Sequence, residues 1–222
     1  MQRREFTAVG FSLIVPGFAW AAVNEGDAAV GVRAALERGA LAAVGLLGRN
    51  DGFLGNPQVR IPLPEHLAGA AKFLKAAGQG KKLDELVTAM NRAAEAAVPV
   101  AKPIFVSAVK ALSVDDALKL VRGSGTSVTD FFAGKTRAPL GEKFLPIVTQ
   151  SIEKLSVAQR YNALAGKAAS LGLIKGDQAN VQQYVTGRAL DGLFLMIGEE
   201  EKKIRADPVK TGSAILKKVF GG

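Results

Sequence analysis

Residues 81–100 read KKLDELVTAMNRAAEAAVPV, and this stretch decides the fold class. Pro99 and Pro103 follow a helical pattern and interrupt it, because proline lacks a backbone donor and clashes inside a helix. We therefore predict a helix over 82–98 and a second helix that runs to Leu112. The apolar residues before the prolines recur with the spacing of one helix face; they are Leu83, Leu86, Val87, Met90, Ala94, Ala97 and Val98.

Helical signals continue on both sides of this stretch. No segment shows sustained strand alternation, and no internal repeat is visible. We predict an all-α protein, a single compact domain over 22–222 with about eight or nine helices and one proline-rich irregular segment. Ser113 with Asp116, and Ser127 with Asp130, have the spacing of a helix-capping pair. Further helices are expected over 28–48, 65–77, 114–122, 137–154, 157–170 and 208–220, with a short one after Ser127 and another that starts at Asp177. Thr136 is the expected cap of the helix over 137–154.

The irregular segment is 49–64, RNDGFLGNPQVRIPLP. Its three prolines cannot lie inside a helix, and a residue that precedes proline favours extended geometry. Val59, Ile61 and Leu63 alternate with more polar positions, so this piece has apolar side chains to bury. We predict an ordered segment that lies across the helices.

The composition excludes several kinds of chemistry. The 222 residues contain no cysteine, which excludes disulfides, cysteine-based zinc sites and thiol catalysis. His66 is the only histidine, and no oriented partner or nucleophile lies near it in the sequence. We predict no metal site, no cofactor and no catalytic residue. The net charge of +9 favours anionic partners.

The first 21 residues have the three parts of a secretory signal peptide. Arg3 and Arg4 form a basic start, an apolar run follows, and Ala19-Trp20-Ala21 ends in the small-x-small pattern. The apolar run is shorter than the roughly 20 residues of a membrane span. We predict cleavage after Ala21, by the Sec or the twin-arginine route, and a periplasmic location for the mature chain.

Several short motifs occur in a characteristic order along the chain. They are Asp51-Gly52-Phe53-Leu54, Pro57-Gln58-Val59-Arg60-Ile61-Pro62-Leu63-Pro64, Met90-Asn91-Arg92-Ala93-Ala94-Glu95, Ala101-Lys102-Pro103-Ile104-Phe105, Lys143-Phe144-Leu145-Pro146-Ile147-Val148, Tyr161-Asn162-Ala163-Leu164, Tyr184-Val185-Thr186-Gly187 and Asp191-Gly192-Leu193. In these motifs and their order the chain resembles one bacterial family of exported proteins, classed as domain of unknown function 4197. The resemblance covers roughly 28–221 and implies an exported helical domain. It transfers no catalytic residue, because the family has no assigned activity.

One polar group on the 82–98 helix is the candidate site. Asn91, Arg92 and Glu95 lie within about one turn, and Arg92 can pair with Glu95 at i, i+3. Two interpretations stay open. The first, which we favour, is that these side chains hold helices or segments together. The second is a basic pocket for an anionic ligand, formed with Arg60 and Lys102.

The leading functional hypothesis is a non-enzymatic envelope module that binds an anionic lipid, an envelope polymer or another envelope protein. The alternative is an envelope hydrolase that uses the carboxylates of Glu95 and Glu142 with Arg60 or Arg92. That enzyme would need the two acids in one pocket with separated pKa values. Nucleic acid is not an expected partner, because few aromatic residues accompany the lysines.

The last part of the chain contains an amphipathic helix pattern and a charged run. The last helix, 208–220, carries an apolar stripe beside Lys217 and Lys218, which suits docking on the domain or a peripheral membrane contact. The run 199–203, EEEKK, is typical of a solvated helix end. The sequence makes no prediction of the oligomeric state.

Overall fold

The computed structural model describes residues 25–64, 75–76, 78, 80–123, 125–153, 158–159, 162 and 180–207. Within these ranges the chain forms six α-helices and one short 3-10 helix, and no β-strand. The predicted all-α class is confirmed. The elements are α1 (Glu25–Leu47), α3 (Gly80–Ala97), η2 (Val98–Val100), α4 (Ala101–Lys110), α5 (Val114–Arg122), α6 (Ser127–Ile152) and α8 (Val181–Ala206).

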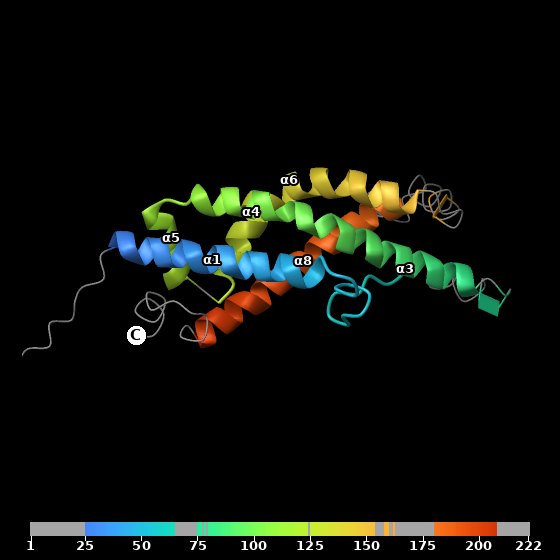
Figure 1. Ribbon diagram of the computed structural model, residues 1–222, viewed down its shortest axis with the longest axis horizontal. Helices are drawn as coiled ribbons and strands as arrows, with labels where there is room; N and C mark the ends of the chain where they lie inside the picture. Colours follow the sequence, from blue (N-terminus) through green and yellow to red (C-terminus); the bar gives the residue numbers. More distant parts are fainter. Residues whose placement is uncertain are drawn as a thin grey trace, which may run out of the picture.

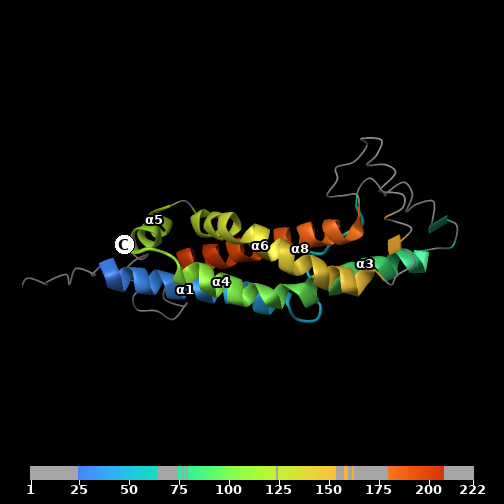
Figure 2. The ribbon, with the colours of Figure 1, turned by 90° about the horizontal axis from the view of Figure 1, so that it is seen from above.

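The helices pack lengthwise into an elongated bundle (Figure 1). α3, η2 and α4 follow one another as a long rod, because Pro99 and Pro103 occupy the start of a turn or helix, where no backbone donor is needed. α1 lies beside this rod in one layer, and α6 and α8 form a second layer that packs against it (Figure 2). α8 runs back along α6 and contacts both α6 and α1 (Figure 1).

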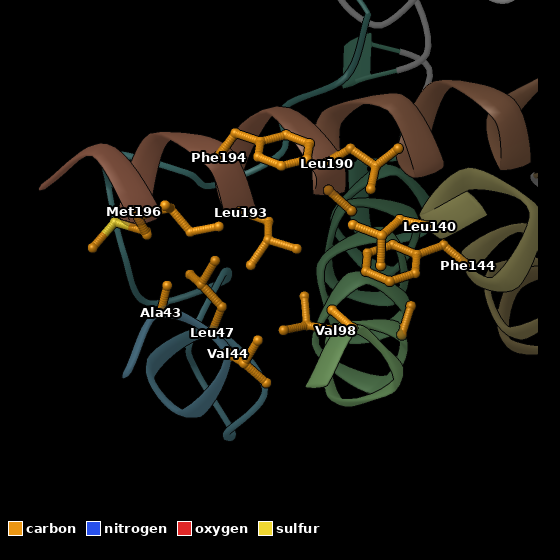
Figure 3. Close-up of a cluster of buried hydrophobic side chains, with 14 of the residues drawn as sticks. Ala43, Val44, Leu47, Val98, Leu140, Phe144, Leu190, Leu193, Phe194 and Met196 are labelled. Carbon is orange, nitrogen blue, oxygen red and sulfur yellow. The ribbon is translucent and has the colours of Figure 1, made fainter. Parts of the chain in front are cut away.

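The core is built from aliphatic residues and a few phenylalanines. Leu190 and Leu193 of α8 point into the space between α1, the α3–α4 joint and α6 (Figure 3). Phe105 packs edge-on against Phe132 and Phe194, with ring centroids 5.2 and 6.4 Å apart. Each large side chain buried in this way contributes about 1.5–3 kcal/mol. Small residues line the buried side of α1, which lets α8 approach closely; they include Ala29, Ala40 and Ala43.

The predicted number of eight or nine helices is too high for the described residues, which hold six α-helices. α6 is one continuous helix where the sequence suggested two, with Pro139 and Pro146 inside it. Thr136 does not cap a second helix; it is buried, and its hydroxyl donates to the Phe132 carbonyl at 2.6 Å. A regularly spaced row of buried residues holds α6 together across this point; it is Phe132, Leu140, Phe144, Val148 and Ile152.

One helix starts at its predicted cap residue, and two helices start at a different residue from the one predicted. Ser113 caps α5, and its hydroxyl accepts from the Asp116 N–H at 3.0 Å. The cap position of α6 is occupied by Thr126 rather than Ser127. α8 begins at Val181, after an Asn180 cap, rather than at Asp177. The helix expected over 208–220, and most of those expected over 157–170 and 65–77, lie outside the described residues.

The irregular segment is ordered and lies against α3 and α8, as predicted. Phe53, Val59 and Ile61 are buried. A side chain at Gly192 of α8 would meet the Phe53 ring at 2.8 Å, so glycine there lets the segment reach the helix. In the part of the chain that the structure describes, no helix is both long and apolar enough to span a membrane.

Candidate functional site

Three residues of α3 hold the irregular segment, and we call them the α3 clasp: Asn91, Arg92 and Glu95. Asn91 is fully buried and binds both backbone groups of Ile61. Its Oδ1 accepts from the Ile61 N–H at 2.8 Å, and its Nδ2 donates to the Ile61 carbonyl at 2.9 Å. Nδ2 also donates to the Val87 carbonyl at 2.8 Å, so both donors of this amide side chain are used.

Glu95 is 5% exposed and holds the other end of the segment. Its Oε1 accepts from the N–H groups of Phe53 and Leu54, both at 3.0 Å. Its Oε2 accepts from Arg92 at 2.7 Å, and Arg92 also reaches the Asp51 carboxylate at 2.8 Å. Hydrogen bonds to an ionised group are stronger than those between neutral groups, so this carboxylate holds the irregular segment firmly at Phe53 and Leu54.

The α3 clasp favours the charged form of Arg92, which arginine keeps in proteins at any physiological pH. The hydrogen bond from Arg92 to Glu95 raises the pKa of the guanidinium above its usual value, and Asp51 adds to this shift. Arg92 therefore serves as a permanent cation that balances the buried carboxylate. This geometry favours the interpretation of the group as a device that joins two segments.

The structure does not bring Arg60 and Lys102 into the clasp. Both side chains are exposed, and neither forms an ion pair or a hydrogen bond with another described residue. Of the five predicted ligand-binding residues, three come together and two point to solvent. A ligand-binding role for the five stays a prediction.

A second clasp, which we call the α8 clasp, was missed by sequence reasoning. It consists of Glu201 and Arg205. Glu201 is 4% exposed and accepts from the Val128 and Thr129 N–H groups at 3.2 and 2.9 Å. Arg205 donates to Glu201 at 2.9 Å and to the Leu120 carbonyl at 3.0 Å. A negative charge at the start of a helix is stabilising, so Glu201 anchors the first turn of α6.

The 199–203 run is therefore not uniformly a solvated helix end. Glu199 and Glu200 pair with lysines on the surface, whereas Glu201 faces α6. The rotation of α8 about its own axis decides which of the three glutamates faces α6 and which two face solvent. The sequence carried one weak signal, a glutamate followed by an arginine at i+4.

A surface groove of about 520 Å³ runs between α6 and α8. Part of its lining carries no large side chain, because it consists of Ala138, Gly141 and Gly187. Gly187 has nothing within 4 Å of where a Cβ would stand, so close packing is not the reason for glycine there. The remaining lining residues, which we group with these as the α6–α8 groove, are Arg137, Glu142, Leu145, Gln183, Thr186 and Leu190.

Thr186 is the unusual member of this groove. It is 8% exposed, and its hydroxyl is one of two buried side-chain atoms in the described residues with no hydrogen-bond partner. A buried hydroxyl without a partner costs about 1–3 kcal/mol. Such a group therefore calls for an explanation, and a bound molecule in the groove would supply one.

The charges beside the groove are arranged around one carboxylate. Asp191 accepts from Arg137 at 2.5 Å and lies 3.9 Å from Arg188. The Arg137 guanidinium also lies over the Phe194 ring, 5.8 Å from its centroid. Two guanidinium groups thus share one acid at this end of the groove.

The two acids of the hydrolase alternative occupy different places. Glu95 belongs to the α3 clasp, and Glu142 lines the α6–α8 groove. Glu95 is bonded to Arg92 and to the irregular segment, so its carboxylate is already occupied. In the described residues, no three acidic or histidine side chains gather as a metal site would need.

These helices, with their groove, define the class of the protein as an all-α bundle. The chain belongs to the family described as "Protein of unknown function (DUF4197)", which matches residues 22–221. The family resemblance of the motifs is thereby confirmed. No match to this chain was found among the curated proteins or among the solved structures. Its function is therefore inferred from its own residues.

Proposed function

We propose that this protein is an exported, non-enzymatic binding module of the cell envelope that holds an anionic ligand in the α6–α8 groove. The ligand class is an anionic lipid or an envelope polymer, with an acidic group beside an apolar or neutral body. The signal-like segment over 1–21 supports export, and the family match starts directly after it, at residue 22. The net charge of +9 supports an anionic partner.

The observation that carries the proposal is the unpartnered hydroxyl of Thr186. A hydroxyl can both donate and accept, so a polar ligand atom in the groove would satisfy it once rotation of the side chain turns the Oγ1 atom, which is buried, towards the groove. Gln183 adds a second group able to donate and accept, and Leu145 and Leu190 add apolar surface. Ligand sites commonly combine an apolar lining with a few placed polar groups in a volume of about 300–1,000 Å³.

The charge of the ligand follows from Arg137 and Arg188. These two arginines carry two positive charges against the single carboxylate of Asp191, so an additional anionic group can pair with them. A guanidinium pairs well with phosphate or carboxylate through two parallel hydrogen bonds. The ligand's acidic group is therefore expected at this end, with its body along Gly141 and Gly187.

A pair of glycine substitutions tests the proposal. Gly187→Leu would fill the groove, and Gly134→Leu makes the same change at an exposed position of α6 where a Cβ also meets nothing. We expect the wild-type mature protein and Gly134→Leu to sediment with phosphatidylglycerol vesicles or with purified cell-wall polymer, and Gly187→Leu to lose this binding.

Thr186→Val adds a second, finer test, because valine keeps the shape and removes the hydroxyl. We expect weaker binding with unchanged or higher stability, since an unpaired buried hydroxyl is lost. Binding to neither probe, or equal binding by Gly187→Leu and Gly134→Leu, would show that the groove is not the site.

A further inference from the structure

A pocket of about 380 Å³ lies between α4, α5 and α6, and we call it the α4–α6 pocket. It shares no lining residue with the α6–α8 groove. Its apolar lining consists of Ile104, Ala108, Leu112 and Phe131, to which Ala111 adds a methyl group. Its volume lies within the range of about 300–1,000 Å³ that is usual for small-molecule sites. The pocket therefore has room for a small molecule with an apolar part.

The walls of this pocket are fixed by contacts within the protein. Phe131 packs edge-on against Phe132, with ring centroids 5.7 Å apart. The Leu112 carbonyl accepts from Arg33 of α1 at 2.6 Å, and the Thr136 hydroxyl donates to the Phe132 carbonyl at 2.6 Å. Since the walls are already ordered, a ligand pays little for ordering them when it binds.

Two opposite charges line the same pocket without forming an ion pair. They are Asp116 of α5 and Lys135 of α6, and both side chains are exposed. A hydrogen bond from the Ser113 side chain is the main cause that lowers the pKa of the Asp116 carboxyl, and the charges of Lys119 and Lys135 lower it further. None of the ion pairs among the described residues joins Asp116 to Lys135. Each group therefore keeps the capacity to bind an opposite charge that enters the pocket.

We infer that the α4–α6 pocket binds a free α-amino acid with an apolar side chain, its ammonium group on Asp116 and its carboxylate on Lys135. An α-amino acid carries both charges on one carbon, and its side chain would lie on the apolar lining. A simple anion would be repelled by Asp116, and a simple cation by Lys135. The hydroxyl of Ser107, which also lines the pocket, can donate to the same carboxylate.

L-Leucine and two blocked forms of it test the need for both charges. N-acetyl-L-leucine lacks the ammonium group, and L-leucinamide lacks the carboxylate. Each is titrated into the mature chain in a calorimeter. We expect leucine to bind, and each blocked form to bind at least about ten-fold more weakly, because each loses one hydrogen bond between charged groups.

Two substitutions identify which protein group meets which charge. Asp116→Asn should weaken leucine binding at least about five-fold, but should leave N-acetyl-leucine binding unchanged or stronger, because that ligand has no ammonium group to lose. Lys135→Gln should weaken leucine binding in the same way and leave leucinamide binding unchanged. A general loss of structure would weaken all three ligands together. Asp115→Asn and Lys143→Gln are matched controls at exposed positions outside the pocket, and both should bind leucine as the wild type does.

Three results overturn the inference. The first is no binding of leucine up to millimolar concentration. The second is equal binding of leucine and its two blocked forms, which would mean that the charges take no part. The third is leucine binding that Asp116→Asn and Lys135→Gln leave unchanged, which would place the amino acid elsewhere. Gly187→Leu fills only the α6–α8 groove and should bind leucine normally, so this site and the anion site proposed for the groove are tested separately.

Discussion

Replacing Glu95 with alanine tests whether the α3 clasp holds the irregular segment. The change removes the acceptor of the Phe53 and Leu54 N–H groups, both bonded at 3.0 Å, and the partner of Arg92 at 2.7 Å. The Arg92 guanidinium that remains is 37% exposed and still pairs with Asp51, so the cost arises mainly from the two backbone N–H groups, at about 1–3 kcal/mol for each one left buried without an acceptor. Since whole domains are stable by only about 5–15 kcal/mol, the effect should be large.

Glu95→Gln separates the two functions of the carboxylate. The amide oxygen can still accept from both backbone N–H groups, but the amide nitrogen would face the Arg92 guanidinium, donor against donor. We expect a loss of about 1.5–3 kcal/mol, the usual value of a hydrogen bond to a charged group. A smaller loss than in Glu95→Ala would show that the backbone bonds carry part of the effect.

The measurement is urea unfolding followed by the helical circular dichroism signal. The only tryptophan, Trp20, lies in the segment expected to be removed, so tryptophan fluorescence is not a suitable signal. Arg60→Ala is the matched control, because Arg60 is exposed and belongs to the same irregular segment. Its effect should stay within about 0.5 kcal/mol.

A cost of less than about 1 kcal/mol for Glu95→Ala, or one no larger than for Arg60→Ala, would refute this role of the α3 clasp. Either result would mean that the two backbone N–H groups find water or another acceptor at little cost. The irregular segment would then be held by its buried apolar residues alone.

Four other substitutions act on contacts elsewhere in the bundle. Gly192→Ala should lower stability in thermal unfolding by about 1–3 kcal/mol, because a Cβ there would lie 2.8 Å from the buried Phe53 ring. Gly187→Ala on the same helix should raise stability by up to about 1 kcal/mol, because a Cβ there meets nothing and alanine favours a helix more than glycine does. Ser113→Ala removes the cap of α5. A separate hydrogen bond from the Ser113 side chain to the Asp116 carboxylate lowers the pKa of that carboxyl below its usual value, so this contribution to stability is present at neutral pH and is lost as the pH falls through the folded value. Carboxyl NMR titration should show the pKa of Asp116 rise in the variant. Glu201→Gln should cost about 1.5–3 kcal/mol and speed hydrogen exchange of the amides in the first turn of α6.

The local part of the fold could be predicted from sequence, because local signals decide it. The spacing of apolar residues over 82–98 gave a helix at the observed place, and Ser113 gave the start of α5. α6 was divided wrongly at Thr136, since a threonine shortly before a proline resembles a helix start. The buried row of residues on both sides of Thr136 outweighs this local preference, and only packing reveals that row.

The site could be predicted in part for the same reason. Arg92 and Glu95 are neighbours on one helix, so their pairing followed from spacing. The backbone groups that Glu95 binds lie 41 and 42 residues earlier, and no pattern in the sequence marks a main-chain donor as a partner. The α6–α8 groove depends on which faces of two distant helices meet, which is likewise a matter of tertiary packing.

Pro146 has a consequence for recognition at the groove. Proline has no N–H, so the carbonyl of Glu142, four residues earlier in α6, lacks the donor that an unbroken helix would give it. Glu142 is one of the residues that line the α6–α8 groove. A main-chain oxygen does not titrate, so this carbonyl is an acceptor whose strength does not depend on pH. A ligand donor that binds this oxygen would keep its contact at any pH, and in every variant of Glu142 itself; only a substitution of Pro146 would remove it.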